Sequence, residues 1–507
     1  MPTHVLVLGD QLTRQVGPLA RAHPKLTHVL MIESRALASA FKHHKQKLVL
    51  FFSAMRHFAR DLQSDGFAVD YLQAESFETG IADYLRKHPG ATLTMMRPSD
   101  WGYEDVLADA ARQAGGSLEV LPNDLWLTTP AEFDEWAGDK KNLRLESFYR
   151  FMRRRTGWLM DGDEPRGGTW NFDAENRETP GSDHAFPEVL RLEPDELSRE
   201  VMELVESTYP DHFGSVEHFN WPVTRPQALE SLKDFCQNRL RGFGPYEDAM
   251  VTGQHALYHS LLSPAINMGL LTAKEVCETA LEFAADGRRK IPLNSIEGFI
   301  RQILGWREFM YHVYRRNMPA LRKANGLNHR RRLPWLYWSG ATGMNCLRQT
   351  VRQLEESGHT HHIQRLMVLG NFALIAQVNP QELNDWFLSC YVDALDWVVT
   401  PNVLGMSQFA DLGSFTSKPY AASANYINRM SDYCRSCQYD RKATVGEKAC
   451  PFNSLYWNFI DRHSDRFAAN PRMALVLRNW QKRTPETQQG IREQAERVKR
   501  ALSDDRL

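Results

Sequence analysis

The chain has 507 residues, with 61 basic against 62 acidic residues and a formal net charge of −1. This balance excludes binding to a polyanion through bulk charge, so any nucleic-acid contact must come from local basic clusters. No apolar run approaches the length of a membrane span, so we expect no membrane partner. Seven cysteines, an odd number, and no visible signal peptide favour a reducing, cytoplasmic compartment.

Strands and helices alternate over the first 121 residues. We expect strands at 3–8, 27–32, 67–72, 92–96 and 117–121, with helices at 37–64, 81–88 and 104–114. This alternation predicts a doubly wound parallel sheet, which binds ligands at the carboxyl ends of its strands. Gly9, Asp10, Gln11 and Glu33 are therefore predicted to line a small-molecule site. A dinucleotide or nucleoside triphosphate is not supported there, because neither a G-x-G-x-x-G motif nor a P-loop is present.

The alternation of strands and helices ends after the fifth predicted strand. A basic, aromatic helix is predicted over 140–155, followed by a long loop over 160–177 that is rich in Gly, Asp and Pro. Such a loop inside a compact chain is usually functional or a linker. We therefore expect an α/β domain over 1–130, a linker over 131–220 and a second domain over 221–507.

The second domain is predicted to be all-α. Helices are expected at 228–240, 293–314, 360–377 and 381–395, a loop at 401–413, and a polar, charged final helix that either frays or faces solvent. Ser260 and Ser263 precede a helix start at Pro264. Hydroxyl groups beside the free N–H groups of a helix start suit a phosphate.

Three cysteines lie in the stretch SDYCRSCQYDRKATVGEKACPF, residues 431–452. Cys434 and Cys437 form a C-x-x-C pair, and Cys450 precedes a proline, which together predict a metal centre. The spacing leaves zinc and iron–sulfur both open, and a redox pair or plain buried cysteines are the simpler alternatives. A fourth ligand must come from elsewhere in the chain, and its candidates are Cys236, Cys277, Cys346 and Cys390.

Six segments, taken in order, resemble the photolyase/cryptochrome superfamily. They are GFGPYEDAM, HSLLSP, EGFIRQILGWREF, HHIQRLMVLGNF, DWFLSCYVDALDWV and PNVLGMSQFAD. The tryptophan-rich NGNWQW ending of the usual flavin site is absent, and PNVLGMSQ followed by the cysteine stretch stands in its place. In these departures the chain is similar to the group of prokaryotic (6-4) photolyases and iron–sulfur bacterial cryptochromes. The resemblance covers essentially the whole chain.

The resemblance implies three cofactors. FAD would lie in the helical domain, and a 6,7-dimethyl-8-ribityllumazine antenna would lie in the sheet domain, hydrogen-bonded near Asp10 and Glu33. A [4Fe–4S] cluster would be held by the three C-terminal cysteines and by Cys346, in the matching segment MNCLR. Cys236, Cys277 and Cys390 would then be small core residues.

The resemblance also assigns the residues around the flavin. These are Tyr246, His259, Ser260, Leu261, Leu262, Ser263, Gln302, Arg307, Asp393 and Asn402. Arg307 is chemically suited to this place, because a guanidinium can hold a phosphate through two hydrogen bonds. Asp393 and Asn402 match positions near the isoalloxazine ring.

The implied reaction is light-driven repair of a (6-4) pyrimidine photoproduct by electron transfer from reduced FAD. The lesion must leave the base stack to reach the flavin. His362, with His361 as its neighbour, is the expected proton donor. Trp386 and Trp338 match tryptophans that carry electrons to the flavin. Phe387 is no practical relay, so the route to the surface stays open between Tyr391 and Tyr420.

The implied partner is UV-damaged DNA, bound by a monomer. The expected contacts are the basic residues at 150–155, Arg177, the loop that carries Trp170, and the segment around Lys418 and Tyr420. Two other functions compete with repair. One is a light-signalling cryptochrome with the same cofactors. The other is a nucleic-acid-binding protein whose fold is stabilised by a bound metal and which has no photochemistry.

Overall fold

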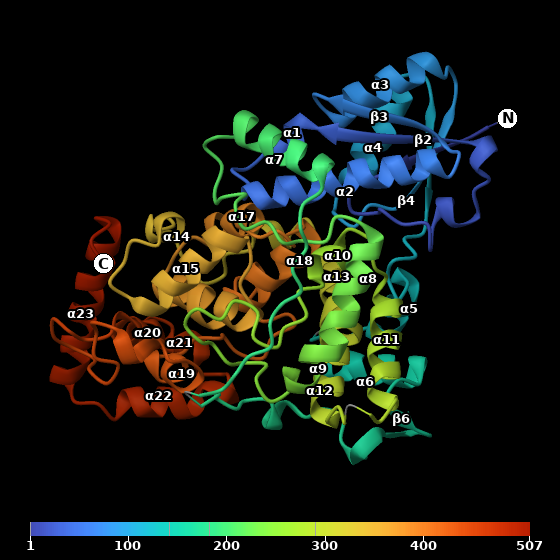
Figure 1. Cartoon of the computed structure of the whole chain (residues 1–507). Coiled ribbons are helices and arrows are strands. Elements are labelled where there is room, and N and C mark those ends of the chain that lie inside the picture. Colours follow the sequence, from blue (N-terminus) through green and yellow to red (C-terminus); the bar gives the residue numbers. More distant parts are fainter. Residues whose placement is uncertain (1, 141, 182, 289) are drawn as a thin grey trace.

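The structure is a computed structural model that describes residues 2–140, 142–181, 183–288 and 290–507. Residue 141, which belongs to the helix predicted over 140–155, lies outside these ranges. A sheet with its helices, blue to cyan, sits at one end of a larger helical body that runs from green to red (Figure 1). The predicted class, an α/β part followed by an all-α part, is confirmed.

The sheet has five parallel strands in the order β3-β2-β1-β4-β5. The strands are β1 (Thr3–Val7), β2 (Thr27–Ser34), β3 (Ala68–Ala74), β4 (Thr92–Met96) and β5 (Ser117–Leu121). β1 and β2 are buried along most of their length. Buried central strands are typical of parallel sheets, because the crossover helices cover both faces.

Four helices accompany these strands: α1 (Arg35–Ser39), α2 (Lys45–Ser64), α3 (Phe77–Lys87) and α4 (Tyr103–Gln113). The single helix predicted over 37–64 is wrong, because His44 separates α1 from α2. The imidazole of His44 accepts a hydrogen bond from the backbone N–H of Gln46 and so caps α2. α3 begins earlier than predicted, because Ser76 and Thr79 form a reciprocal capping pair.

The segment between the sheet and the helical body contains more regular structure than predicted. It holds α5 (Pro130–Ala137), α6 (Leu145–Thr156), β6 (Met160–Asp161), β7 (Glu164–Pro165), η3 (Arg166–Gly168), η4 (Asp173–Glu175) and α7 (Glu196–Thr208). α7 packs against α2 and lies beside it in Figure 1. The chain therefore returns to the sheet before it enters the helical body.

The helical body begins after residue 224. Its first elements are α8 (Arg225–Asp234), η5 (Phe235–Arg239), α9 (Leu240–Phe243), α10 (Ser263–Asn267), α11 (Ala273–Ala285), α12 (Leu293–Ile300), η6 (Arg301–Arg307), α13 (Glu308–Asn317) and η7 (Leu321–Lys323). Then come α14 (Leu336–Ser339), α15 (Asn345–Ser357), η8 (Gln364–Gly370), α16 (Asn371–Ile375), α17 (Pro380–Cys390), α18 (Asp396–Thr400) and η9 (Pro401–Ser407). The loop predicted over 401–413 is wrong in its first half, since η9 is helical. Pro401 is tolerated because it stands in the first turn of that helix.

The C-terminal part closes one side of the body. It comprises α19 (Ala424–Met430), η10 (Tyr433–Ser436), α20 (Pro451–Arg462), α21 (Ser464–Phe467), η11 (Pro471–Met473), α22 (Ala474–Gln481) and α23 (Pro485–Ser503). The prediction that the final helix faces solvent is wrong. Ile491, Ala495, Val498 and Leu502 recur on one face of α23 and are buried, and α23 packs against α20.

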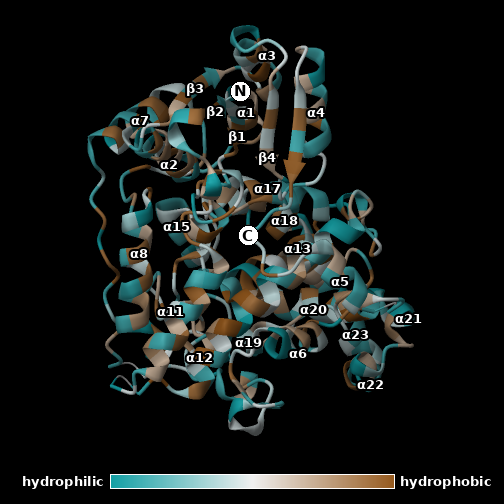
Figure 2. Ribbon diagram, turned by 90° about the vertical axis from the view of Figure 1, so that its right-hand side faces the viewer, coloured by the Kyte–Doolittle hydropathy of each residue, from teal (hydrophilic) through white to brown (hydrophobic). Residues whose placement is uncertain are grey.

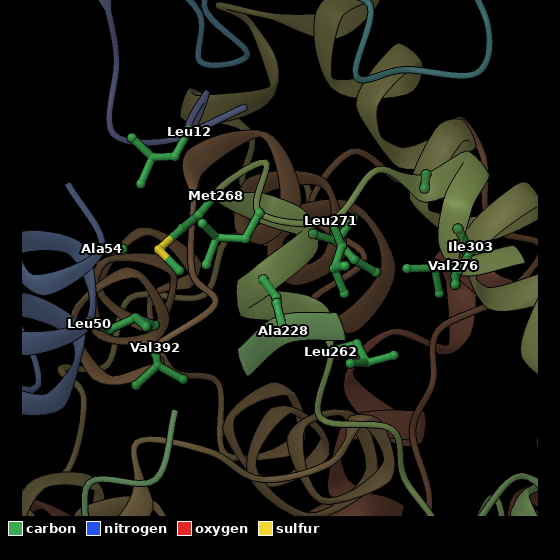
Figure 3. Packing of buried hydrophobic residues seen from close by; sticks show 14 of the residues in the cluster. Leu12, Leu50, Ala54, Ala228, Leu262, Met268, Leu271, Val276, Ile303 and Val392 are labelled. Carbon is green, nitrogen blue, oxygen red and sulfur yellow. The ribbon is translucent and has the colours of Figure 1, made fainter. Parts of the chain in front are cut away.

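One hydrophobic core joins the sheet to the helical body. Figure 3 shows Leu12 together with Leu50 and Ala54 of α2 near Met268 and Val392 of the body. The backbone N–H of Leu12 also donates a hydrogen bond of 2.8 Å to the carbonyl of Met268. Along the outer helices hydrophobic and hydrophilic residues alternate, which is typical of helices with one buried face (Figure 2). Within the described residues, no helix is both long and apolar enough to span a membrane.

Candidate functional site

The helical body encloses a cavity of about 350 Å³. The predicted residues that line it are His259, Ser260, Leu261, Ser263, Gln302, Arg307, His361, His362, Asp393 and Asn402. They come from segments that are far apart in the sequence, from His259 to Asn402. A volume in this range and a mixed lining of apolar and polar groups are typical of a small-molecule site.

Two predicted contact residues do not reach this cavity. Leu262 is only 1% exposed and belongs to the hydrophobic core. The backbone takes a positive φ of 60° at Leu261, which turns the next side chain away. Tyr246 instead stacks on Tyr258, with ring centroids 5.3 Å apart.

Three π-helical segments contribute to the cavity wall. Gln302 and Arg307 lie on η6, Arg365 on η8, and Asn402 on η9. Such segments are rare and concentrate at functional sites, because they widen the helix and re-aim side chains. Hydrophobic periodicity gives no signal for them, so the sequence predicted plain helices or a loop here.

Arg365 and Asp393 form a two-point ion pair in the cavity wall. Nη1 and Nη2 of Arg365 donate to the two carboxylate oxygens at 2.9 and 3.1 Å. Ser263 Oγ donates to the same carboxylate at 2.7 Å, and Arg365 Cζ lies 4.0 Å from the ring centroid of Tyr391. Burial alone would raise the pKa of Asp393, but the charges of Arg365 and His359 and these hydrogen bonds lower it to about 2. Arg365 was not among the predicted site residues, because only the folded chain brings it to Asp393.

Several buried nitrogen atoms at this cavity have no hydrogen-bond partner in the protein. They are Nε and Nη1 of Arg307, both ring nitrogens of His361, and Nε2 of His259. Burial lowers the pKa of Arg307 to about 10, and its Cζ lies 4.1 and 4.8 Å from the ring centroids of Trp126 and Trp397. Buried polar groups are rarely left unpaired, so these atoms call for a ligand rich in acceptors. FAD, with its phosphates, hydroxyls and ring carbonyls, meets this requirement.

Gln302 is oriented by a buried acid. Its Nε2 donates a hydrogen bond of 2.6 Å to Oε1 of Glu247, whose other oxygen accepts from Asn176 at 3.0 Å. Burial raises the pKa of Glu247. Because the amide nitrogen is engaged, the carbonyl oxygen of Gln302 is the group left for a ligand.

His361 and His362 differ sharply in their surroundings. His361 is buried and stacks on His259 with ring centroids 4.6 Å apart, and burial together with the neighbouring histidines keeps its pKa well below 6.5. The side chain of His362 is 46% exposed, and its Nε2 lies 3.7 Å from Oδ1 of Asp248. Asp248 also accepts a hydrogen bond of 3.3 Å from the hydroxyl of Tyr426. Only His362 is therefore open to a large substrate at the cavity.

The two predicted electron-transfer tryptophans lie in one hydrophobic cluster but in different contacts. Trp386 is buried, 5.1 Å from both Tyr337 and Phe387 by ring centroids. Phe387 lines the cavity and stacks on Tyr391 at 5.2 Å. Trp338 packs against Phe213 at 5.8 Å. Trp386 is thus one ring away from the cavity.

The four predicted metal ligands come together around one small cavity. Cys346 lies on α15, Cys434 and Cys437 lie in and just after η10, and Cys450 caps α20. Burial and the neighbouring sulfurs raise the pKa of the Cys346 thiol, and burial raises the pKa of Cys450 to about 12. A bound cation would reverse this effect, because metal ions deprotonate coordinating thiols.

The four sulfurs line one cavity, and Cys346 and Cys450 are buried there. Four thiolates are the ligand set of a tetrahedral zinc and of a [4Fe–4S] cluster alike. Cys277 and Cys390, two of the rejected candidates, are buried in the hydrophobic cores, as is Cys236.

A second cavity of about 320 Å³ lies between the carboxyl end of the sheet and helices α17 and α18. Asp10 and Glu33 both line it, as predicted, together with Gly9. Glu33 is already engaged, because Arg56 donates to its two oxygens at 2.7 and 3.0 Å and the hydroxyl of Tyr71 donates as well. Burial raises the pKa of Asp10 to about 6, which leaves Asp10 the more available hydrogen-bonding group.

One predicted residue does not reach this cavity, and one residue that lines it was not predicted. Gln11 does not line it, because its side-chain amide donates to the carbonyls of Met96 and Arg97, both at 3.1 Å. Asp100, which the sequence analysis did not single out, does line it. Burial and the nearby Asp396 and Asp10 raise the pKa of Asp100 to about 7. Acids from both parts of the chain therefore share this cavity.

The basic run at 150–155 is only partly available to a partner. Arg153 is fully buried and donates to the carbonyl of Trp170 at 2.9 Å, so its predicted DNA contact is wrong. Arg155 pairs with Glu132 at 2.6 Å. Arg154 is exposed, and its Cζ lies 4.7 Å from the ring centroid of Trp170.

Comparisons with known proteins place these observations in context. A family model for "Deoxyribodipyrimidine photo-lyase-related protein" matches residues 5–221. The chain is 41% identical over 504 residues to a protein named (6-4) photolyase from Agrobacterium fabrum, covering 98% of this chain and 99% of that protein. It is 23% identical to a deoxyribodipyrimidine photo-lyase from Buchnera aphidicola, over 46% of this chain and 48% of that protein.

Two solved structures share the fold. One is a bacterial class III photolyase from Agrobacterium tumefaciens, with a TM-score of 0.58 and 17% identity over 99% of this chain and 98% of that chain. The other is a cryptochrome from Synechocystis, with a TM-score of 0.59 and 15% identity over 95% of this chain and 94% of that chain.

Proposed function

The chain belongs to the family of the bacterial (6-4) photolyases, and on that premise we propose that it repairs (6-4) pyrimidine photoproducts in DNA under light. The observation that carries the proposal is the larger cavity, where eight of the ten residues assigned to flavin binding meet beside one accessible histidine. Light-signalling by a cryptochrome is the alternative, but the relative that matches over nearly the full length is named for repair.

Binding of FAD is assigned to the groups without protein partners. Arg307 would donate to acceptors of the dinucleotide, and the carbonyl of Gln302 would accept from it. When bound, FAD supplies the light-absorbing group and the electron that the repair requires. Arg365, fixed by Asp393, holds the wall formed by η8 in place, while Phe299, Ile303 and Trp306 exclude water from the same cavity.

His362 is assigned as the proton donor to the lesion. A photoproduct that leaves the base stack approaches the cavity from outside, so its proton must come from an accessible group. Nε2 of His362 is that group, and Asp248 at 3.7 Å orients the imidazole. His361, buried and held neutral by its surroundings, would support the ring stack with His259 rather than transfer a proton.

The other two cofactors are proposed on chemical grounds. We assign a [4Fe–4S] cluster to Cys346, Cys434, Cys437 and Cys450, supported by their meeting around one cavity and by the cysteine–proline end of the segment at Cys450. Its role would be structural, since the ligands tie α15 to the start of α20. We assign a lumazine antenna to the cavity at the sheet, with Asp10 as its hydrogen-bonding acid.

DNA would be held by exposed cations around the mouth of the flavin cavity. Arg177 lies 3.9 Å from Asp248, which is the carboxylate beside His362. Arg154 on α6 and Lys418 are exposed as well and are proposed as further phosphate contacts. These charges would contact phosphates and position the duplex without reading its sequence.

The deciding experiment illuminates the reduced, FAD-loaded protein with an oligonucleotide that carries a single (6-4) photoproduct. Loss of the lesion in the light but not in the dark is expected. His362→Ala should reduce the repair rate by about a hundredfold or more, the usual contribution of a positioned proton donor. The matched control His218→Ala removes an exposed imidazole elsewhere and should repair at the wild-type rate. An inactive wild type would refute repair, while an active His362→Ala would refute only the proton-donor assignment.

A further inference from the structure

Three histidines and an aspartate meet at the amino-terminal edge of the sheet, opposite the cavity that Asp10 lines. His4 on β1 and His28 on β2 stand side by side in the strand register, so their side chains share one face. Asp70 lies on the adjacent strand β3, and His88 follows the last turn of α3. Four elements that are far apart in sequence therefore bring chemically reactive groups to one point.

The distances among these groups are those of an open metal site. One ligand atom each from His28, Asp70 and His88 lies within 4.8 Å of the other two. Nε2 of His88 is 3.8 Å from Oδ2 of Asp70. The ring centroids of the three histidines are 5.1 to 5.4 Å apart. Ordinary packing does not explain this, since Nδ1 of His28 is shut off from solvent and has no hydrogen-bond partner in the protein.

We propose that His28, Asp70 and His88 bind a zinc ion at this edge of the sheet. Two imidazoles and one carboxylate are an established zinc ligand set that leaves a further position open. Bonds of about 2.1 Å would bring the ligand atoms to about 3.4 Å from one another, a contraction that rotation of half-buried side chains can supply. The side chains of His88 and Asp70 are 23% and 25% exposed, which gives the ion an entry path.

The surroundings support this ligand set. Lys87 Nζ lies 3.4 Å from Oδ1 of Asp70, so Oδ2 is left for the metal, and the 61% exposed lysine is free to move aside. The hydroxyl of Tyr84 lies 2.7 Å from Nδ1 of His4 and fixes the third imidazole next to the site. Outer hydrogen bonds of this kind orient the ligands of a metal. The fourth position of the ion is left open to water.

The proposed zinc would act on the sheet and not on the light-driven reaction. His28 and Glu33, at the other cavity, are five positions apart on β2, which is roughly 16 Å along a strand. The ion would link β2 and β3 to the end of α3. An ion bound only by the folded chain stabilises it by mass action.

The test uses tag-free holoprotein with its full iron content, equilibrated with buffered zinc and then measured for zinc by mass spectrometry. We expect one zinc per chain in the wild type, and a strong anomalous signal at the zinc edge between His28 and His88 in crystals. His88→Ala and Asp70→Asn change partly exposed side chains and should fold normally. Each should weaken zinc binding by at least about tenfold.

Two controls separate this site from other histidines. His218→Ala should retain zinc, since that imidazole is exposed and belongs to neither histidine group. His362→Ala should also retain zinc, which excludes binding by His259, His361 and His362, whose ligand atoms also lie within 4.8 Å of one another. The proposal is overturned if the wild type takes up no zinc, if the double variant Asp70→Asn/His88→Ala keeps it, or if His362→Ala loses it.

Discussion

The ion pair between Arg365 and Asp393 offers a quantitative test of how the cavity wall is held. Asp393 has a pKa of about 2 against an ordinary value of 3.8. At 1.36 kcal/mol per unit, this difference corresponds to about 2 kcal/mol in favour of the ionised, paired state. Breaking a buried pair by removal of one partner typically costs about 3–5 kcal/mol. We therefore expect Asp393→Asn to lower the free energy of unfolding by about 2–5 kcal/mol at neutral pH.

The pH dependence has a definite sign. Because the pKa of Asp393 is lowered in the folded protein, its stabilisation is fully present above about pH 4 and is lost as the pH falls through about 2. The difference between wild type and Asp393→Asn should thus be constant from neutral pH down to about pH 5. A difference that disappears already near neutral pH would show that another group is responsible.

The assay is urea unfolding followed by far-ultraviolet circular dichroism on wild type, Asp393→Asn, Arg365→Gln and the double variant. Coupled residues should give a double variant that is less destabilised than the sum of the single variants. Asp109→Asn is the matched control, because Arg112 and Asp109 form a pair of 2.6 Å with side chains 74% and 56% exposed. Such surface pairs contribute less than about 1 kcal/mol. If Asp393→Asn costs no more than Asp109→Asn, or if the single effects simply add, the ion pair does not hold this wall.

Three further predictions follow from individual side chains. Cys346→Ser should lower the iron content of the purified protein to near zero. Cys390→Ala, which also removes a buried thiol, should retain the iron. Equal iron content in both variants would contradict the ligand assignment. Asp10→Asn should raise the thermal midpoint of unfolding at about pH 8 but not at about pH 4. Because the pKa of Asp10 is raised to about 6 in the folded protein, the wild-type protein loses stability as the pH rises through that value and the carboxyl ionises. Trp386→Phe should slow light-driven reduction of bound flavin by an external reductant, measured by flavin absorbance, and an unchanged rate would place the electron route elsewhere.

The sheet was predictable because its signal is local. Short β-branched runs alternate with amphipathic segments, and both β4 and β5 begin and end at the predicted residues. The cysteines were equally accessible to sequence reasoning, since C-x-x-C spacing has few meanings. What spacing left open was the fourth ligand and the kind of metal. The resemblance supplied Cys346, and the folded chain shows it beside the other three sulfurs.

Other features depend on contacts that no local pattern encodes. η9 was predicted as a loop because its proline and glycine suggest a turn, yet the cavity wall requires a helix there. α23 was predicted to face solvent because its overall composition is polar, although the four buried positions follow a helical period. Arg365 escaped notice because its partner Asp393 lies 28 residues away. Cation and carboxylate become a pair only through the packing of η8 against the turn after α17.

That turn is also where the two cavities come closest. Ala394 lines both the flavin cavity and the cavity at the sheet, while Asp393 faces the first and Asp396 the second. Arg365 fixes one end of this short segment, and Asp100 of the sheet domain accepts the backbone N–H of Trp397 at 2.9 Å at the other end. The segment is therefore held from both domains, which sets the distance and orientation between the two cavities. An antenna bound at the sheet would depend on this rigidity, so loss of the Arg365–Asp393 pair should impair energy transfer to the flavin even where both chromophores remain bound.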